Sequence, residues 1–249
     1  YIFKDNATKA YASEWLAAMD ELELDFQALV NHKQVYHMYV EDWDNTRLIG
    51  GSEPATTITD SKATDKSMHY NMIVPNPQAL INVLKATPKF NYTGGKNGIA
   101  EEKGTFQYAN FTIGEMQTLI QKIKDEGGFW VHVHPKQYMK SDDPLDYWFA
   151  DYTGLEVFYV DPDMDDSKEN YKLWTDLLAL GKRVWATAGY DQHNLPTGKT
   201  INVIYSEKKD AATYVSHLAE GDFVCGNVGI RMAIGDATMG GHTDFAGKR

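Results

Sequence analysis

Residues 127–135 read Gly-Gly-Phe-Trp-Val-His-Val-His-Pro, and this stretch decides which fold we expect. The two glycines would end a preceding helix, and the large residues after them are typical of a strand buried on both faces. Side chains two positions apart on a strand share a face, so His132 and His134 are predicted to point toward one spot. Because β/α proteins bind ligands at the open ends of parallel strands, we expect a binding site here.

Strand patterns alternate with helix patterns along most of the chain. Strands are expected at residues 24–30, 47–50, 68–74, 154–160, 184–188 and 201–205. Helices are expected at residues 11–21, 34–43, 77–85, 112–126, 142–151, 169–180 and 210–220. Thr112 and Glu115 have the spacing of a capping box. Residues 56–67 and 87–111 are predicted to be loops, the second an insertion or lid. This alternation predicts a parallel sheet or barrel.

The composition is that of an ordinary globular protein. The 249 residues are 43% hydrophobic and 24% charged, and the net charge is −11. The acidic surplus argues against a nucleic-acid-binding surface, because phosphate backbones attract basic patches. Cys225 is the only cysteine, so neither an internal disulfide nor a thiolate zinc cluster can form. No apolar run has the length of a membrane span and no signal peptide is visible, which leaves the compartment open.

Histidines and carboxylates gather at the ends of the predicted strands, or, for His69, near a strand's start. These residues are His32, Glu53, His69, His132, His134, Asp191 and His193. Imidazoles combined with carboxylates suit Zn, Mn or Fe better than Ca or Mg. A centre with several such ions lowers the pKa of a bridging water and clamps a phosphoryl group. The sequence contains neither a Gly-x-Ser-x-Gly nucleophile elbow nor a P-loop.

Five segments in a fixed order resemble the motifs of the polymerase and histidinol phosphatase (PHP) family of metal-dependent phosphoesterases. They are DFQALVNHKQ, GGSEPAT, HYNMI, VHVHP and GYDQHN. In that family the corresponding segments read as an apolar strand ending in Thr-Asp-His, then Gly-Ile-Glu, a His-led strand, a strand ending in His-Pro, and Ser-Asp-x-His. The resemblance runs from about Asp5 to His193, and residues 218–236 look like the β-rich tail of the branch that carries a C-terminal extension.

The resemblance implies an α/β fold, a distorted (β/α)7 TIM-like barrel over residues 1–221, with a β-rich C-terminal extension over residues 222–249. It also implies two or three divalent transition-metal ions, Zn, Mn or Fe, and a small phosphorylated substrate. The metal ligands, carried over by position, would be Asp5, His32, Glu53, His69, His134, Asp191 and His193. The catalytic residues would be His134, Asp191 and His193.

Other residues near the predicted strand ends are candidates for the substrate. Those expected to bind its phosphate are Lys33, Lys136 and Arg47. His132 matches no ligand position of the family and would either line the pocket or pack. An aromatic wall beside the metals would come from Tyr138, Tyr190 and Trp148. Glu156 fits a common strand of the family, and we expect it to be a satisfied carboxylate inside the barrel.

Two departures from the family pattern keep other functions open. The family's first motif, His-x-His, would precede Tyr1, and a protein without it would lose two ligands of one metal site. Asn31 stands where the family has an Asp before the ligand His32, which removes a charge that orients the imidazole. The alternatives are a catalytically impaired, ligand-binding protein and an amidohydrolase-type metallohydrolase. The second would use a carbamylated lysine at a strand end, and no lysine is well placed for it.

Overall fold

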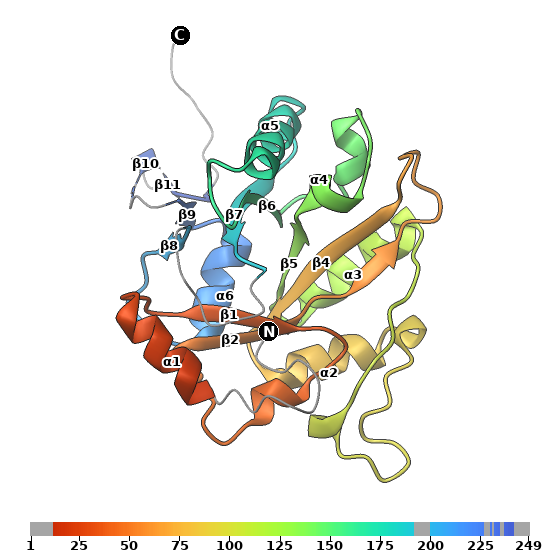
Figure 1. Ribbon diagram of the computed structural model, residues 1–249, viewed down its shortest axis with the longest axis vertical. Coiled ribbons are helices and arrows are strands. Elements are labelled where there is room, and N and C mark those ends of the chain that lie inside the picture. Colours follow the sequence, from red (N-terminus) through yellow and green to blue (C-terminus); the bar gives the residue numbers. More distant parts are fainter. Residues whose placement is uncertain (1–11, 192–199, 227–229, 231, 235–236, 242–249) are drawn as a thin grey trace.

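The protein has a mixed α/β fold built on a sheet that curls into half a barrel (Figure 1). The computed structural model describes residues 12–191, 200–226, 230, 232–234 and 237–241. The strand order is β1 (Gln27–Asn31), β2 (Leu48–Ser52), β4 (Ser67–Val74), β5 (Phe129–Val133), β6 (Thr153–Tyr159) and β7 (Val184–Gly189), with β3 (Ala55–Thr57) paired to β4 beside this path. Among the described strands β1 pairs only with β2 and β7 only with β6, so a closed (β/α)7 barrel is not confirmed.

The prediction of a parallel sheet is wrong for one strand. β1 is parallel to β2, and β5, β6 and β7 are parallel to one another, but β4 is antiparallel to both β2 and β5. A parallel strand needs a crossover connection, normally a helix, and residues 53–66 between β2 and β4 contain no helix. β4 therefore runs back along the sheet, and its first residues lie beside the last residues of β5.

Most of the expected helices form, with two exceptions. The α-helices are α1 (Ala12–Glu21), α2 (Pro77–Lys85), α3 (Ile113–Asp125), α4 (Pro135–Tyr138), α5 (Asp165–Ala179) and α6 (Ala211–Glu220). The helices expected at residues 34–43 and 142–151 are only short 3-10 turns, η1 (Tyr36–Tyr39) and η4 (Pro144–Tyr147). The 87–111 loop carries two more, η2 (Pro88–Phe90) and η3 (Glu101–Lys103). No helix in the described residues is both long and apolar enough to cross a bilayer.

Four short strands follow the main sheet. β8 (Asn202–Ile204) pairs with β9 (Phe223–Cys225), and β10 (Ala233–Ile234) pairs with β11 (Ala237–Thr238), both antiparallel. β9 belongs to the residues predicted to form a C-terminal extension, and it pairs with a strand that precedes that segment.

β5 is buried on both faces, as its sequence predicts. Trp130 lies in the core between the sheet and helices α2 and α3, together with Tyr70 of β4. Phe129 lies on the other face, in a core that includes Tyr214 and Leu218 of α6. Residues 129–133 are all at most 3% exposed, so the strand is held between two apolar layers and its end is a rigid platform.

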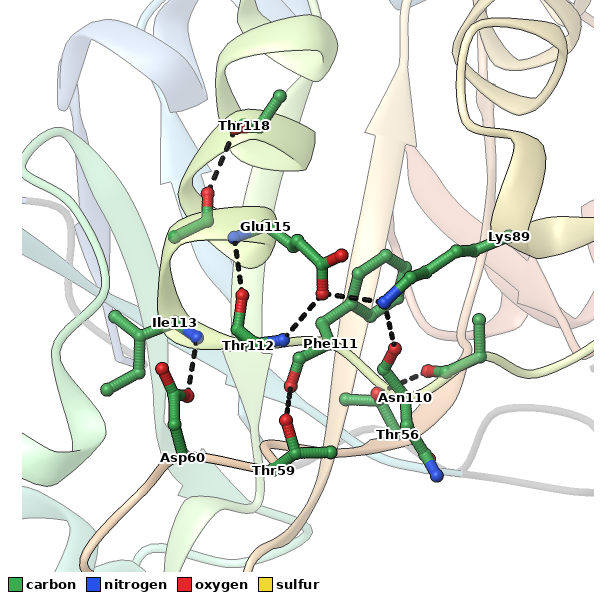
Figure 2. Close-up of polar contacts among 12 residues, drawn as sticks. Thr56, Thr59, Asp60, Lys89, Asn110, Phe111, Thr112, Ile113, Glu115 and Thr118 are labelled. Atoms are coloured by element: carbon green, nitrogen blue, oxygen red, sulfur yellow. Dashed lines mark hydrogen bonds and ion pairs between the residues drawn. The ribbon is translucent and has the colours of Figure 1, made fainter.

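The capping box at the start of α3 is confirmed (Figure 2). The Thr112 hydroxyl accepts a hydrogen bond from the Glu115 amide at 3.2 Å, and the Glu115 carboxylate accepts one from the Thr112 amide at 2.8 Å. Lys89 places its ammonium 2.6 Å from the same carboxylate. The cap therefore satisfies two backbone groups that a helix end leaves without partners.

Replacing Thr112 with alanine is expected to lower the free energy of unfolding by about 1 kcal/mol, because the cap oxygen is lost. Thr118→Ala in the same helix is the control: its exposed hydroxyl donates to the Gly114 carbonyl within the helix, and we expect a change within about 0.5 kcal/mol. Urea denaturation of both variants measures the two values. Equal effects would show that the cap contributes nothing specific.

Candidate metal centre

Three side chains converge at the end of β5: Glu53, His69 and His134. The Nδ1 atom of His69 lies 3.0 Å from Oε1 of Glu53 and 3.2 Å from Nε2 of His134, and this Nε2 lies 3.7 Å from the same Oε1. Glu53 and His134 are buried, and His69 is partly buried. One nitrogen or oxygen of each residue thus faces a common point.

The spacing of these three atoms fits a bound ion. Ligand atoms about 2.0 Å from a tetrahedral zinc ion lie roughly 3.3 Å from one another, and the separations here are 3.0, 3.2 and 3.7 Å. Two imidazoles and one carboxylate are a donor set that Zn, Mn and Fe accept. The residues therefore fit a divalent transition-metal ion.

The backbone brings the three residues together from strands distant in sequence. Glu53 directly follows β2, and its amide donates to the Asn31 carbonyl at the end of β1. His69 is opposite Val133 in the antiparallel pairing of β4 with β5, which places it next to His134. The start of β4 and the end of β5 therefore meet at one edge of the half barrel, where β2 also ends.

His134 leaves the strand in an uncommon backbone conformation. Its φ is +31°, in the left-handed region that non-glycine residues seldom adopt. β5 consequently ends at Val133, and His134 no longer follows the alternation of the strand. Its side chain turns into the cluster, while His132 faces the opposite core. Such strain is found most often at functional sites, where surrounding contacts hold it.

Glu156 of β6 fixes the orientation of His134. Its Oε2 atom accepts a hydrogen bond from the His134 amide at 2.6 Å and lies 3.2 Å from Nδ1 of the same residue. With the Nδ1 proton directed at Glu156, the Nε2 lone pair faces Glu53 and His69, which is the usual arrangement of a metal-binding imidazole. Gly189 makes room for this carboxylate, because a Cβ there would lie 2.0 Å from its Oε1 atom.

The pKa values reflect these contacts. Burial raises the pKa of Glu156 above its ordinary value, and the hydrogen bond and charge of His134 offset only part of that rise. Burial alone would lower the pKa of His134, but the hydrogen bond and charge of Glu156, with the charges of Glu53 and Asp191, raise it overall. For Glu53, the bond to His69 and the charges of His134 and His32 outweigh burial and lower the pKa. The cluster is an environment that favours positive charge.

Asp191 and two tyrosines complete the surroundings of His134. The Tyr159 hydroxyl donates to Oδ2 of Asp191 at 3.2 Å, and its ring centre lies 5.5 Å from that of His134. The Tyr138 ring stacks on His69, with 4.3 Å between ring centres and 23° between planes. Burial, and then the charge of Asp191, raise the pKa of Tyr159 well above the ordinary value. Both phenols therefore stay protonated near the cluster.

His32 lies at the edge of the site. Its Nδ1 atom is 2.6 Å from the Glu53 carbonyl oxygen, and its ring centre is 6.4 Å from that of His69. A hydrogen bond from Nδ1 to a carbonyl leaves Nε2 as the coordinating nitrogen of a histidine ligand. His32 therefore has the tautomer of a metal ligand, at a position next to the three-residue cluster.

A cavity of about 200 Å³ extends from the cluster into the half barrel. Glu53, His134, Glu156 and Asp191 line one end of it. The rest of the lining is formed by apolar side chains, such as Ile73 and Leu218, and by polar ones, such as Asn71 and Asn202. A cavity of about 150 Å³ can hold benzene, so this space is large enough for a small organic group beside the cluster.

Several residues predicted for the site lie elsewhere. His132 packs away from the cluster, with Nδ1 3.3 Å from the Tyr147 carbonyl, and burial lowers its pKa to about 3. Arg47 precedes β2 at the opposite end of the strand from Glu53 and is 2.6 Å from Asp20. The sign of its charge suggested a phosphate partner, but its partner is an exposed carboxylate.

The two lysines predicted to bind the phosphate, Lys136 and Lys33, contact other residues of the protein. Lys136 donates to the Ser141 carbonyl at 3.0 Å and to the Tyr147 hydroxyl at 3.1 Å. Lys33, next to His32, places its ammonium 4.0 Å from the centre of the Tyr108 ring.

The remaining predicted site residues are Trp148, Tyr190, Asp5 and His193. Trp148 packs in another core and has the Lys182 ammonium 3.7 Å from its ring. Tyr190 lines the cavity, and its hydroxyl accepts from the Thr200 amide. Asp5 and His193 lie outside the described residues.

Sequence reasoning underrated two residues of the site. Glu156 was expected to be a satisfied barrel carboxylate, and its partner proves to be the amide and ring of His134. Tyr159, three residues farther along, was not considered. The available signal was a single glutamate in the middle of the apolar strand Gly154–Val160, because a carboxylate there must have a buried partner.

The chain matches no protein-family model and no curated protein. The solved structures that are similar to it include the following two. One is a candidate metal-dependent phosphoesterase from Bifidobacterium adolescentis, with 14% identity, a TM-score of 0.44, and coverage of 82% of this chain and 90% of that chain. The other is an amidohydrolase from Chromobacterium violaceum with bound sulfate and no metal, with 14% identity, a TM-score of 0.44, and coverage of 73% and 85%. Similarity at this level shows no family, and the PHP resemblance stays a prediction.

Proposed function

We propose that the protein is a metal-dependent hydrolase that cleaves phosphoesters. The observation that carries this proposal is the convergence of Glu53, His69 and His134 on one point at metal-ligand spacing. A divalent ion bound there would lower the pKa of a coordinated water and attract the phosphoryl oxygens. Glu53, His69 and His134 would hold the ion, with His32 and Asp191 beside them.

The other residues of the site have supporting roles in this proposal. Glu156 holds the Nδ1 proton of His134 and keeps Nε2 directed at the cluster. Tyr159 orients Asp191 by donating a hydrogen bond to its Oδ2 atom. The cavity beside these groups would receive the organic part of the substrate and exclude water from it.

Two features favour the phosphoester over the amide as substrate. The order of the five sequence motifs resembles that of a phosphoesterase family. An amidohydrolase of the carbamylated-lysine type would need a lysine at the cluster. The two lysines nearest in sequence to the cluster ligands, Lys66 and Lys136, donate to the Thr59 carbonyl and to Ser141 and Tyr147. Lys33, next to His32, lies over the Tyr108 ring. The described cluster supplies three ligands, which is enough for one ion but not for the two or three ions that the family resemblance implies. A catalytically impaired protein therefore remains an alternative, and the test below distinguishes it by bound metal without turnover.

The test is turnover by protein stripped with a chelator and then reloaded with Zn, Mn or Fe. We expect hydrolysis of p-nitrophenyl phosphate that disappears when the metal is stripped and returns when it is reloaded. We expect no release of p-nitroaniline from p-nitroacetanilide. Metal-dependent cleavage of the anilide alone would replace the proposal with an amidohydrolase. Bound metal without turnover of either compound would indicate a ligand-binding protein.

A further inference from the structure

Tyr138 covers the candidate metal centre. It belongs to α4, which begins at Pro135 directly after His134. Its ring lies flat on the His69 imidazole at 4.3 Å and meets the His134 ring nearly edge-on, with centres 5.5 Å apart and 65° between planes. Two of the three residues in the cluster therefore fix the position of one phenol ring, which has only two rotatable bonds.

The hydroxyl of Tyr138 differs from those of its neighbours. Tyr159 donates to Asp191, and the Tyr147 hydroxyl donates to the Met139 carbonyl at 3.0 Å. Tyr138 is partly buried, and its hydroxyl makes no hydrogen bond to any residue that the structure describes. Because the Tyr138 ring contacts the imidazoles of both His69 and His134, its hydroxyl lies close to the cluster.

The three positive side chains predicted to bind the phosphate have other partners in the described structure. Arg47 is at the far end of β2, Lys136 is bonded to Ser141 and Tyr147, and Lys33 sits over the ring of Tyr108. An oxyanion next to the ion needs donors directed at the oxygens that the ion does not hold, and a fixed neutral hydroxyl supplies one without the desolvation cost of a buried ammonium.

We propose that the Tyr138 hydroxyl binds the anionic group of the substrate by donating a hydrogen bond to a non-bridging phosphoryl oxygen. This inference rests on the proposed function, because it places a phosphoryl group at the Glu53, His69 and His134 cluster. Tyr138 is then a substrate-binding residue, and its ring also keeps the His69 imidazole in place.

The test uses Tyr138→Phe, which keeps the stacked ring and removes only the hydroxyl. In the full metal-loaded chain, the inhibition constant of inorganic phosphate is measured together with KM, kcat and metal content. We expect phosphate inhibition to weaken at least tenfold while metal content stays at the wild-type value, since a hydrogen bond to a charged group is lost. Tyr171→Phe is the control, because Tyr171 lies on α5 and is 49% exposed; it should behave as wild type.

Three results would overturn the inference. If phosphate inhibition is unchanged in Tyr138→Phe and the wild type is active, the Tyr138 hydroxyl does not bind the phosphoryl group, and the proposed function still stands. Loss of metal in Tyr138→Phe would assign the hydroxyl a structural role. A wild-type protein that binds no metal would overturn the proposed function, and this inference with it. A second variant, Tyr138→Leu, removes the stacked ring too and should lower metal content, which separates the part played by the ring from that of the hydroxyl.

Discussion

Replacing Glu53 with glutamine is expected to release the metal ion and to lower kcat/KM for a phosphoester by about a thousandfold. The metal's contribution to catalysis is several kcal/mol, and about 4 kcal/mol corresponds to that factor. Glu53 supplies the only carboxylate of the three-residue cluster, and its pKa is held below the ordinary value, so it is ionised at neutral pH. Glutamine keeps the shape of the side chain and removes its charge.

Elemental analysis after gel filtration, together with steady-state rates, checks this prediction. Glu169→Gln is the matched control, because Glu169 is an exposed glutamate on α5. Its metal content and rate should equal those of the wild type. A Glu53→Gln protein that keeps the full metal content of the wild type would show that other residues hold the ion.

Glu156→Gln is expected to weaken metal binding by about 10- to 100-fold, although Glu156 is not one of the three converging residues. Carboxylates that orient a coordinating imidazole typically have effects of this size. The Oε2 atom of Glu156 contacts both the amide and Nδ1 of His134. Glutamine can keep these contacts through its single oxygen, but it removes the negative charge that raises the basicity of the imidazole. The Nε2 atom would therefore be a weaker ligand for the metal ion.

Gly189→Ala tests the same contact from the neighbouring strand. The added Cβ would meet the Glu156 carboxylate at 2.0 Å and displace it from His134, so we expect a similar loss of metal affinity. Gly114→Ala is the control, since a Cβ at that exposed position of α3 meets nothing within 4 Å. Competition with a chromophoric chelator gives both dissociation constants. If Gly189→Ala and Glu156→Gln both bind the metal with wild-type affinity, Glu156 has no role in metal binding.

The sequence predicted most of the helices and strands, because their local signals are strong. The capping box of α3 and the doubly buried strand β5 formed where they were expected. The direction of β4 was missed because strand direction depends on the connection rather than on the strand itself. Residues 53–66, which connect β2 to β4, contain no helix, and the chain returns antiparallel to β2.

The candidate site was predicted in part. Glu53, His69 and His134 come together as the motif order indicated. The expectation that His132 and His134 share a spot was wrong, because it assumed that the strand continues through His134. The left-handed backbone of His134 ends the alternation, and periodicity alone cannot reveal a single backbone torsion angle.

The most direct test of the metal centre is anomalous diffraction from crystals of the protein soaked in zinc chloride. Data collected on both sides of the zinc absorption edge would locate the ion without reference to activity. We predict a peak about 2 Å from Oε1 of Glu53, Nδ1 of His69 and Nε2 of His134. A map with no peak at this cluster, or with zinc bound only at other residues, would contradict this prediction.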